Sequence, residues 1–147
     1  MNLTERVDVD APPETVFAAA TDWERQREWM LGTTVRVRRG DGRSVGSEVE
    51  AVTGICGIGA TDSMRITVWD APVRCEVRHT GWVVRGTGIF TVQPCGHAAA
   101  TLVWTEQLEL PLGALGRLGW PLVRPVFAWG LRRSLDRFAE FCRTYPG

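Results

Sequence analysis

The sequence predicts an α+β fold in which an antiparallel sheet of about seven strands is covered by a long C-terminal helix. Two observations support this fold class. Apolar and polar residues alternate along several successive short segments, and the C-terminal segment repeats apolar residues at helical spacing. The chain has 147 residues, of which 44% are hydrophobic and 23% are charged, as is typical of a folded domain with a sizeable core. We therefore expect a single domain spanning residues 1–147.

The first strand is expected at residues 2–10, where apolar residues alternate with polar ones. The proline pair at residues 12–13 ends this strand, and the second proline is placed to fix φ in the first turn of a helix. Glu14 complements the positive end of the dipole of that helix. The strand is therefore expected to turn directly into a short helix.

Further segments with the strand pattern follow, and Gly- or Pro-containing breaks separate most of them. They lie at residues 33–39, 45–54, 63–71, 73–80, 83–92 and 99–110. Several strands in succession indicate a meandering antiparallel sheet. A sheet of this size has one face that another element must cover.

The C-terminal segment can supply that cover. Apolar residues recur there at intervals of three to five, as an amphipathic helix requires: Leu118, Leu122, Phe127, Leu131, Leu135 and Phe138. Pro121 and Pro125 cannot lie in the middle of an undisturbed helix. We expect an irregular or kinked lead-in, followed by a regular helix from about residue 125 to 143.

Composition and motifs exclude several classes of function. The 17 basic and 17 acidic residues cancel and the basic residues are dispersed, so we expect no nucleic-acid partner. All 17 basic residues are arginine, which excludes a lysine Schiff base. The four cysteines are far apart and there is no His-Glu-x-x-His motif. We expect no metal site and no cofactor.

The same inspection suggests where the protein is found. The N-terminal residues lack the basic start and apolar run of a signal peptide. The sequence has no apolar stretch of ~20 residues that could cross a bilayer. These features favour a cytoplasmic protein with no integral membrane segment.

Three segments carry a resemblance to a known family. They are Ala-Pro-Pro-Glu-x-Val-Phe at residues 11–17, Asp-Trp followed by a second Trp at residues 22–29, and Leu-Val-Trp-Thr-Glu-Gln-Leu-Glu-Leu-Pro-Leu-Gly at residues 102–113. In this order they resemble the START-like, helix-grip (SRPBCC) superfamily, and within it the bacterial polyketide cyclase/dehydratase-like members. The resemblance covers nearly the whole chain. It implies that the sheet is curved, that two short helices follow the first strand, and that an apolar cavity holds a lipid, polyketide or hormone.

Strand periodicity gives three candidate catalytic residues. Side chains alternate with period two, so Glu106 shares a face with Trp104 and is expected to point at the cavity. By the same counting, His79 and Asp70 look inward near strand ends. A histidine with a carboxylate can abstract a proton next to a carbonyl or help to expel water. The structural alternatives are a Glu106 that lies near the mouth of the cavity or pairs with an arginine of the last helix, and a His79 that lies in a turn.

The predicted ligand contacts lie on the inward strand faces and on the closing helix. They are Trp104, Phe90, Val77, Ile66, Trp120, Phe127, Leu131 and, as a second inward carboxylate, Glu5. The chain has 7 Trp, and large rings are suited to lining a cavity for planar ligands. Core packing is the alternative interpretation of an aromatic stripe at helical spacing.

Three functions remain open at this point. The first is binding or carriage of one hydrophobic small molecule by a monomer or homodimer. The second is a polyketide cyclase or dehydratase that uses Glu106, His79 or Asp70 for general acid–base catalysis. The third is a non-catalytic interaction module, because residues 113–123 could expose an apolar patch.

Overall fold

The fold was obtained as a computed structural model that describes residues 2–55, 58–81, 85–109 and 113–147, without the side chains of residues 55 and 58. The elements in chain order are β1 (Asn2–Val9), α1 (Pro13–Ala20), the 3₁₀ helix η1 (Trp23–Glu28), β2 (Thr33–Arg39), β3 (Glu48–Ile55), β4 (Ile58–Asp70), β5 (Arg74–His79), β6 (Arg85–Pro94), β7 (Ala100–Glu109) and α2 (Ala114–Arg143). The expected strand ends at residues 83 and 110 lie outside the described residues.

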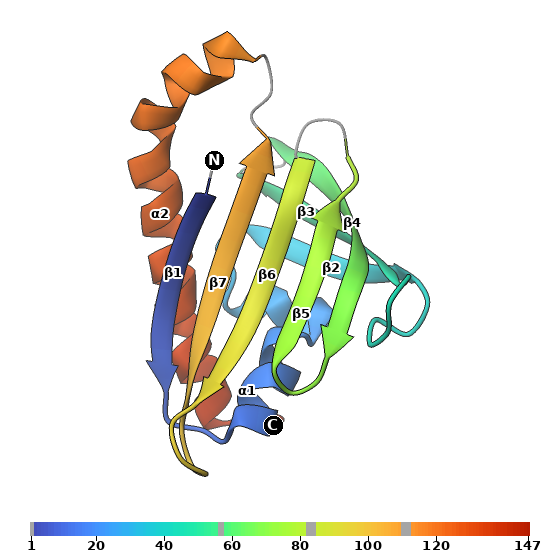
Figure 1. Cartoon of the computed structure of the whole chain (residues 1–147), viewed down its shortest axis with the longest axis vertical. Helices are drawn as coiled ribbons and strands as arrows, with labels where there is room; N and C mark the ends of the chain where they lie inside the picture. The colour runs from blue at the N-terminus through green and yellow to red at the C-terminus, as the bar shows by residue number, and fades with distance from the viewer. Residues whose placement is uncertain (1, 56–57, 82–84, 110–112) are drawn as a thin grey trace.

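The strands form one seven-stranded sheet in the order β1-β7-β6-β5-β4-β3-β2, and neighbouring strands are antiparallel. The sheet curves, α2 runs along it, and the two short helices lie near one end (Figure 1). This arrangement confirms the α+β helix-grip fold expected from the sequence. The curvature leaves a concave face that only partly fills with side chains, and that face carries the candidate site.

A β-bulge in β4 changes which residues face inward. The pairing of β4 with β5 shifts between Ile66 and Val68, and such an extra residue reverses the alternation of side chains beyond it. Trp69 therefore turns inward and packs against Phe17, with ring centroids 5.1 Å apart. Asp70, expected to look into the cavity, is instead exposed. Simple counting along the strand does not detect a bulge.

Helix α2 begins at Ala114 rather than near residue 125, so the lead-in, expected to be irregular or kinked, is a bent part of the helix itself (Figure 1). Pro121 and Pro125 both lie inside the helix. Each proline lacks the N–H that would bond to the preceding turn. This part of α2 is largely exposed, so water can bond to the freed carbonyls, and the helix bends across the open end of the sheet (Figure 1). In the described part of the chain, no helix has the length and apolar character to span a membrane.

An aromatic cluster joins four elements beneath the concave face. The ring of Trp29, which is fully buried, lies 4.8 Å from Phe138 of α2, 6.0 Å from Trp104 of β7 and 6.2 Å from Phe90 of β6. Such edge-to-face contacts add to the large apolar area that each ring buries. The cluster fixes α2 and the end of η1 onto the sheet.

Candidate functional site

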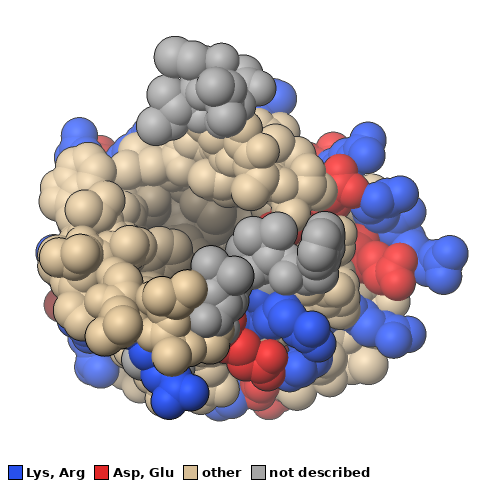
Figure 2. All heavy atoms as spheres, turned by 90° about the horizontal axis from the view of Figure 1, so that it is seen from above, with Lys and Arg blue, Asp and Glu red and all other residues tan. Residues whose placement is uncertain are grey.

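A cavity of about 420 Å³ lies between the concave face of the sheet and α2. Seen from above, the molecule has a hollow surrounded mainly by uncharged side chains, and charged side chains lie mostly at the periphery (Figure 2). The volume is within the ~300–1,000 Å³ of typical small-molecule sites. Of the predicted ligand contacts, five line this cavity: Val77, Phe90, Trp104, Phe127 and Leu131.

Three other predicted contacts lie elsewhere. Ile66 is fully buried in the core and is not part of the cavity wall. Trp120 packs its ring against Phe127, with centroids 6.3 Å apart, instead of lining the described cavity. Glu5 is on the inward side of β1, but α2 covers that strand. Its carboxylate therefore pairs with Arg132 at 2.9 Å.

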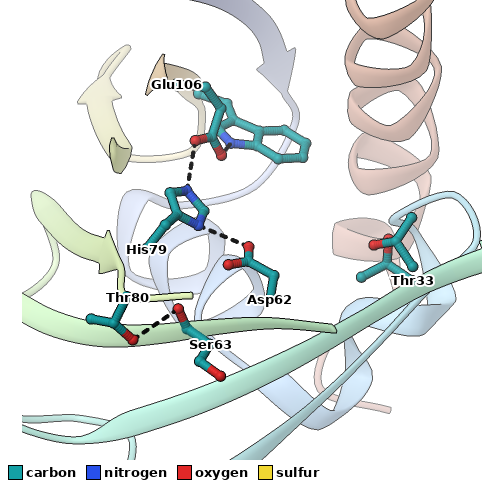
Figure 3. Close-up of polar contacts among 8 residues, drawn as sticks. Thr33, Asp62, Ser63, His79, Thr80 and Glu106 are labelled. Carbon is teal, nitrogen blue, oxygen red and sulfur yellow. Dashed lines mark hydrogen bonds and ion pairs between the residues drawn. The ribbon is translucent and has the colours of Figure 1, made fainter. Parts of the chain in front are cut away.

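A charged cluster breaks the apolar lining. His79 lies between two carboxylates: its Nδ1 is 2.8 Å from Asp62 Oδ2, and its Nε2 is 2.9 Å from Glu106 Oε2 (Figure 3). The indole Nε1–H of Trp104 donates to the other oxygen of Glu106 at 3.0 Å. All four residues line the cavity. The acid–histidine cluster, as we call Asp62, His79 and Glu106, thus lies in an apolar chamber.

Two glycines in β6 allow the cluster to form. His79 of β5 is paired with Gly86, and Glu106 of β7 is paired with Gly88. Because β6 carries no side chain at either position, residues from the strands on both sides can meet above it. A Cβ on Gly88 would lie only 3.2 Å from Oε1 and 3.3 Å from Oε2 of Glu106. The spacing Gly86-Thr-Gly88 therefore makes room for a carboxylate in the sheet.

The end of β5 is tied firmly to β4. The backbone N–H of Thr80 donates to the carbonyl of Ser63 at 2.7 Å, and its hydroxyl donates to the same carbonyl at 3.1 Å (Figure 3). These two bonds fix the backbone next to His79, so its ring is held beside Asp62. His79 is 6% exposed and belongs to a strand, which excludes the alternative of a turn residue.

Asp62 is the member that the sequence analysis missed. The expected strand began at residue 63, whereas β4 begins at Ile58. Extending the alternation of Met64 and Ile66 back by two positions places Asp62 on the same inward face. The sequence pattern could therefore have identified Asp62. Asp70 does not reach the cluster because of the bulge described above. Glu106 is paired with His79, not with an arginine of the last helix.

The surroundings of His79 favour its charged form. Burial by itself lowers the pKa of an imidazole. The hydrogen bonds that the His79 ring donates to Asp62 and Glu106, together with the negative charge of these two residues, outweigh burial and raise the pKa of His79 from 6.5 to about 10. At neutral pH the cluster is therefore an imidazolium held between two carboxylates, with one surplus negative charge.

The other polar side chains on the cavity wall already have structural partners. Gln26 donates to the carbonyl of Ala20 at 2.8 Å, Ser134 accepts the N–H of Leu31 at 3.1 Å, and Thr33 is bonded to Thr53. By contrast, Asp62 Oδ1 is buried and has no hydrogen-bond partner among the described residues. A buried acceptor without a partner is costly, so this oxygen is a natural contact for a polar group on a bound molecule.

Other chemistry at this site is less well supported. Cys75 also lines the cavity, but burial and then the charge of Glu76 raise the pKa of its thiol to about 12, so it is not an active nucleophile at neutral pH. Within the described residues, no group of three or more His, Cys, Asp or Glu side chains is arranged to hold a metal ion. The acid–histidine cluster is instead suited to proton transfer.

The sequence was compared with families of known proteins. Residues 1–142 match the family described as "Polyketide cyclase / dehydrase and lipid transport". The chain belongs to this family. None of the curated proteins compared matches it. This membership agrees with the resemblance seen in the sequence motifs. It supports one of two functions, which are binding of a small hydrophobic ligand and a polyketide cyclase role.

Solved structures support the fold. TTHA0849 from Thermus thermophilus is 19% identical, with a TM-score of 0.83 and full coverage of both chains. The Zhui aromatase/cyclase from Streptomyces sp. R1128 is 14% identical, with a TM-score of 0.79 over 97% of this chain and 93% of that one. Norcoclaurine synthase from Thalictrum flavum, in complex with dopamine and hydroxybenzaldehyde, is 12% identical, with a TM-score of 0.70 over 100% and 88%. At these identities the similarity is one of fold.

Proposed function

We propose that this protein binds one hydrophobic small molecule in its cavity and moves a proton on it, as a polyketide cyclase or dehydratase does. The observation that supports this proposal is the acid–histidine cluster inside an otherwise apolar chamber. A simple carrier of apolar molecules has no need of three ionisable groups on its cavity wall, since burying them is costly.

In this proposal Glu106 is the proton acceptor. Both imidazolium protons of His79 are held by carboxylates, so the acceptor must be a carboxylate, and we assign that role to Glu106. When Glu106 takes a proton from carbon next to a ligand carbonyl, the remaining His79–Asp62 pair is electrically neutral. Proton uptake thus moves the surplus negative charge from the carboxylate to the enolate oxygen of the ligand, and the net charge inside the cavity is unchanged. The protonated Glu106 can return its proton to a leaving hydroxyl, which then departs as water.

His79 and Asp62 have supporting roles. His79 orients the Glu106 carboxylate and neutralises its charge, and Trp104 holds the second oxygen of that carboxylate. The unpartnered Oδ1 of Asp62 would accept a hydrogen bond from a hydroxyl of the ligand. The ligand class that suits this chamber is an apolar, ring-forming molecule with carbonyl and hydroxyl groups, as polyketides have.

Carriage without chemistry is the second candidate. It is favoured by one feature, which is that the cluster and Trp104 largely satisfy one another's hydrogen bonds without a ligand. In that case the cluster would serve only to fix the strands around the cavity.

Two assays on one matched pair of variants separate these candidates. Glu106→Gln keeps the shape of the side chain but cannot take up a proton, while Glu109→Gln changes an exposed carboxylate of the same strand. Binding is followed with Nile red, an uncharged apolar dye, and turnover is followed by mass spectrometry with a synthetic poly-β-ketone. We expect Glu106→Gln to bind the dye but to lose turnover by about 100-fold or more. We expect Glu109→Gln to bind the dye and to turn over the poly-β-ketone as the parent protein does.

Failure can take two forms. If the parent protein binds Nile red but leaves a panel of poly-β-ketones unchanged, the carrier function replaces the enzymatic one. If it turns a poly-β-ketone over and Glu106→Gln does so equally well, Glu106 is not the proton acceptor. A co-purifying molecule found by native mass spectrometry would identify the compound class to test first.

A further inference from the structure

Helix α2 contributes a single polar side chain to the described cavity wall, that of Ser134. The inward positions of this part of the helix follow at intervals of three and four residues: Phe127, Leu131, Ser134 and Phe138. The first three line the cavity, and Phe138 packs in the aromatic cluster around Trp29. Ser134 is only 3% exposed. An apolar residue is the usual choice at such a position, so the buried hydroxyl needs a physical reason.

The oxygen of Ser134 has a structural role. It accepts the backbone N–H of Leu31 at 3.1 Å, and the carbonyl of Leu31 accepts the hydroxyl of Thr33 at 3.1 Å. These bonds tie α2 to the segment between η1 and β2. The hydroxyl proton of Ser134, by contrast, is donated to no described residue. A buried serine in a helix commonly donates to the carbonyl four residues earlier, and Ser134 makes no such bond.

The hydroxyl of Ser134 differs in this respect from its neighbours. The other side chains on the described wall that carry a hydroxyl or a ring N–H donate within the protein: Trp23, Thr33, Thr53, His79 and Trp104. Thr53 is the donor to Thr33, because the proton of Thr33 already goes to Leu31. A buried donor without an acceptor is costly. An oxygen of a bound molecule is therefore the natural partner for Ser134.

Free acceptors and this free donor lie on opposite walls of the cavity. The acid–histidine cluster belongs to β4, β5 and β7, and at neutral pH it offers carboxylate oxygens to a ligand. Ser134 belongs to α2, which covers the sheet (Figure 1). Thr33, which shares the Leu31 peptide with Ser134, lies beside α2 and apart from the cluster (Figure 3). A ligand thus meets acceptors on the sheet and a donor on the helix.

We propose that Ser134 donates a hydrogen bond to a carbonyl oxygen of the ligand. The inference rests on the proposed function, since it adds to that function a ketone oriented across the cavity. A carbonyl oxygen only accepts hydrogen bonds, so the carboxylates repel it and the free O–H attracts it. A poly-β-ketone carries carbonyls at alternate carbons. Holding one of them at α2 therefore fixes which carbon faces Glu106, and Ser134 is a positioning residue.

Two probes of nearly the same shape test this proposal on the full chain, without turnover. The ketone 2-acetylnaphthalene has a carbonyl where the hydrocarbon 2-isopropenylnaphthalene has a methylene group. Binding of each is measured by displacement of Nile red. We expect Ser134→Ala to weaken binding of the ketone about 10-fold, as for loss of one hydrogen bond, and to leave binding of the hydrocarbon unchanged. Ser134→Thr keeps the hydroxyl and should bind both probes as the parent protein does.

Infrared spectroscopy of the bound ketone, labelled with carbon-13 at the carbonyl, gives a second test. A hydrogen bond weakens the C=O bond, so the carbonyl band should lie at lower wavenumber in the parent protein than in hexane. Ser134→Ala should remove this difference. The matched control is Thr21→Val, which removes a buried hydroxyl that donates to the carbonyl of Phe17 at 2.8 Å and is not on the described cavity wall. It should leave both measurements unchanged.

Three results would overturn the proposal. The ketone does not displace Nile red, Ser134→Ala weakens binding of both probes equally, or the carbonyl band in the parent protein matches that in hexane. Equal weakening would mean that Ser134 acts only through its bond to Leu31. The infrared comparison with hexane needs the parent protein alone, so it decides the question even if Ser134→Ala does not fold. Failure of the proposed function is a different result, because it is decided by poly-β-ketone turnover in the parent protein and in Glu106→Gln.

Discussion

The aromatic cluster around Trp29 and the acid–histidine cluster around His79 meet on strand β7 but are held together by different forces. The first is aromatic and uncharged, with Trp29 and Phe138 both fully buried. The second holds three ionisable side chains in a chamber with few other polar groups. Trp104 belongs to both, since its ring packs on Trp29 and its N–H bonds to Glu106. The aromatic cluster stabilises the fold. The acid–histidine cluster places charged groups at the ligand cavity, and the stable fold keeps them there.

Loss of the aromatic cluster should have the largest effect on stability. Phe138→Ala removes a fully buried ring that packs 4.8 Å from Trp29. We expect the free energy of unfolding in urea to fall by about 4 kcal/mol, from lost burial and the cavity that remains. Phe141→Ala, which removes a half-buried ring of the same helix, should cost clearly less. If the two variants lose the same free energy of unfolding, the Trp29 cluster is not a main source of stability.

The next largest effect is expected from the centre of the charged cluster. His79→Ala leaves Asp62 and Glu106 buried without their shared cation, which should lower the free energy of unfolding at pH 7 by about 3 kcal/mol. The loss should shrink as pH rises through about 10, because the imidazole of the parent protein then loses the charge that stabilises the fold. His97→Ala, at an exposed loop position, is the control and should be neutral. A His79→Ala penalty that stays constant from pH 7 to a pH above 10 would show that packing, not charge, is responsible.

Substitution of the residue shared by both clusters separates their contributions. Trp104→Phe keeps an aromatic ring against Trp29 but removes the N–H that bonds to Glu106. We expect a loss of about 2 kcal/mol in the free energy of unfolding, typical of a hydrogen bond to a charged group. In the Glu106→Leu background the same change should cost much less. If the two losses are equal, the indole hydrogen bond does not hold the carboxylate.

The smallest effect on stability is expected at the glycine that makes room for Glu106. Gly88→Ala brings a Cβ within 3.2 Å of the carboxylate, and we expect a cost of about 1 kcal/mol. Because the carboxylate must shift, turnover or ligand retention should suffer more than stability. Gly119→Ala is the matched control, since nothing lies within 4 Å of its Cβ, and alanine should slightly stabilise the helix. If the two variants behave alike, Gly88 does not position Glu106.

The sequence predicts the fold better than the site, for reasons that particular residues make clear. Periodicity alone places Glu106, Trp104 and His79 on inward faces, because that information is local to each strand. The bulge between Ile66 and Val68 does not show in the alternation of residues along the strand, and it turns Asp70 outward. Contact across β6 between His79 and Glu106 depends on sheet order and register, which no single strand encodes.

The most direct test of the account is the protonation of His79 in the folded protein. The pKa raised to about 10 means that folding favours the charged imidazole. Its contribution to stability is therefore fully present below the ordinary value of 6.5 and is lost as pH rises through about 10. Nitrogen-15 NMR of the imidazole reads this state directly, with the His79→Ala spectrum used for assignment. We predict that both ring nitrogens of His79 stay protonated through pH 8 and that the ring loses a proton only near pH 10. A neutral ring at pH 8 would contradict the claim that two carboxylates hold an imidazolium inside the cavity.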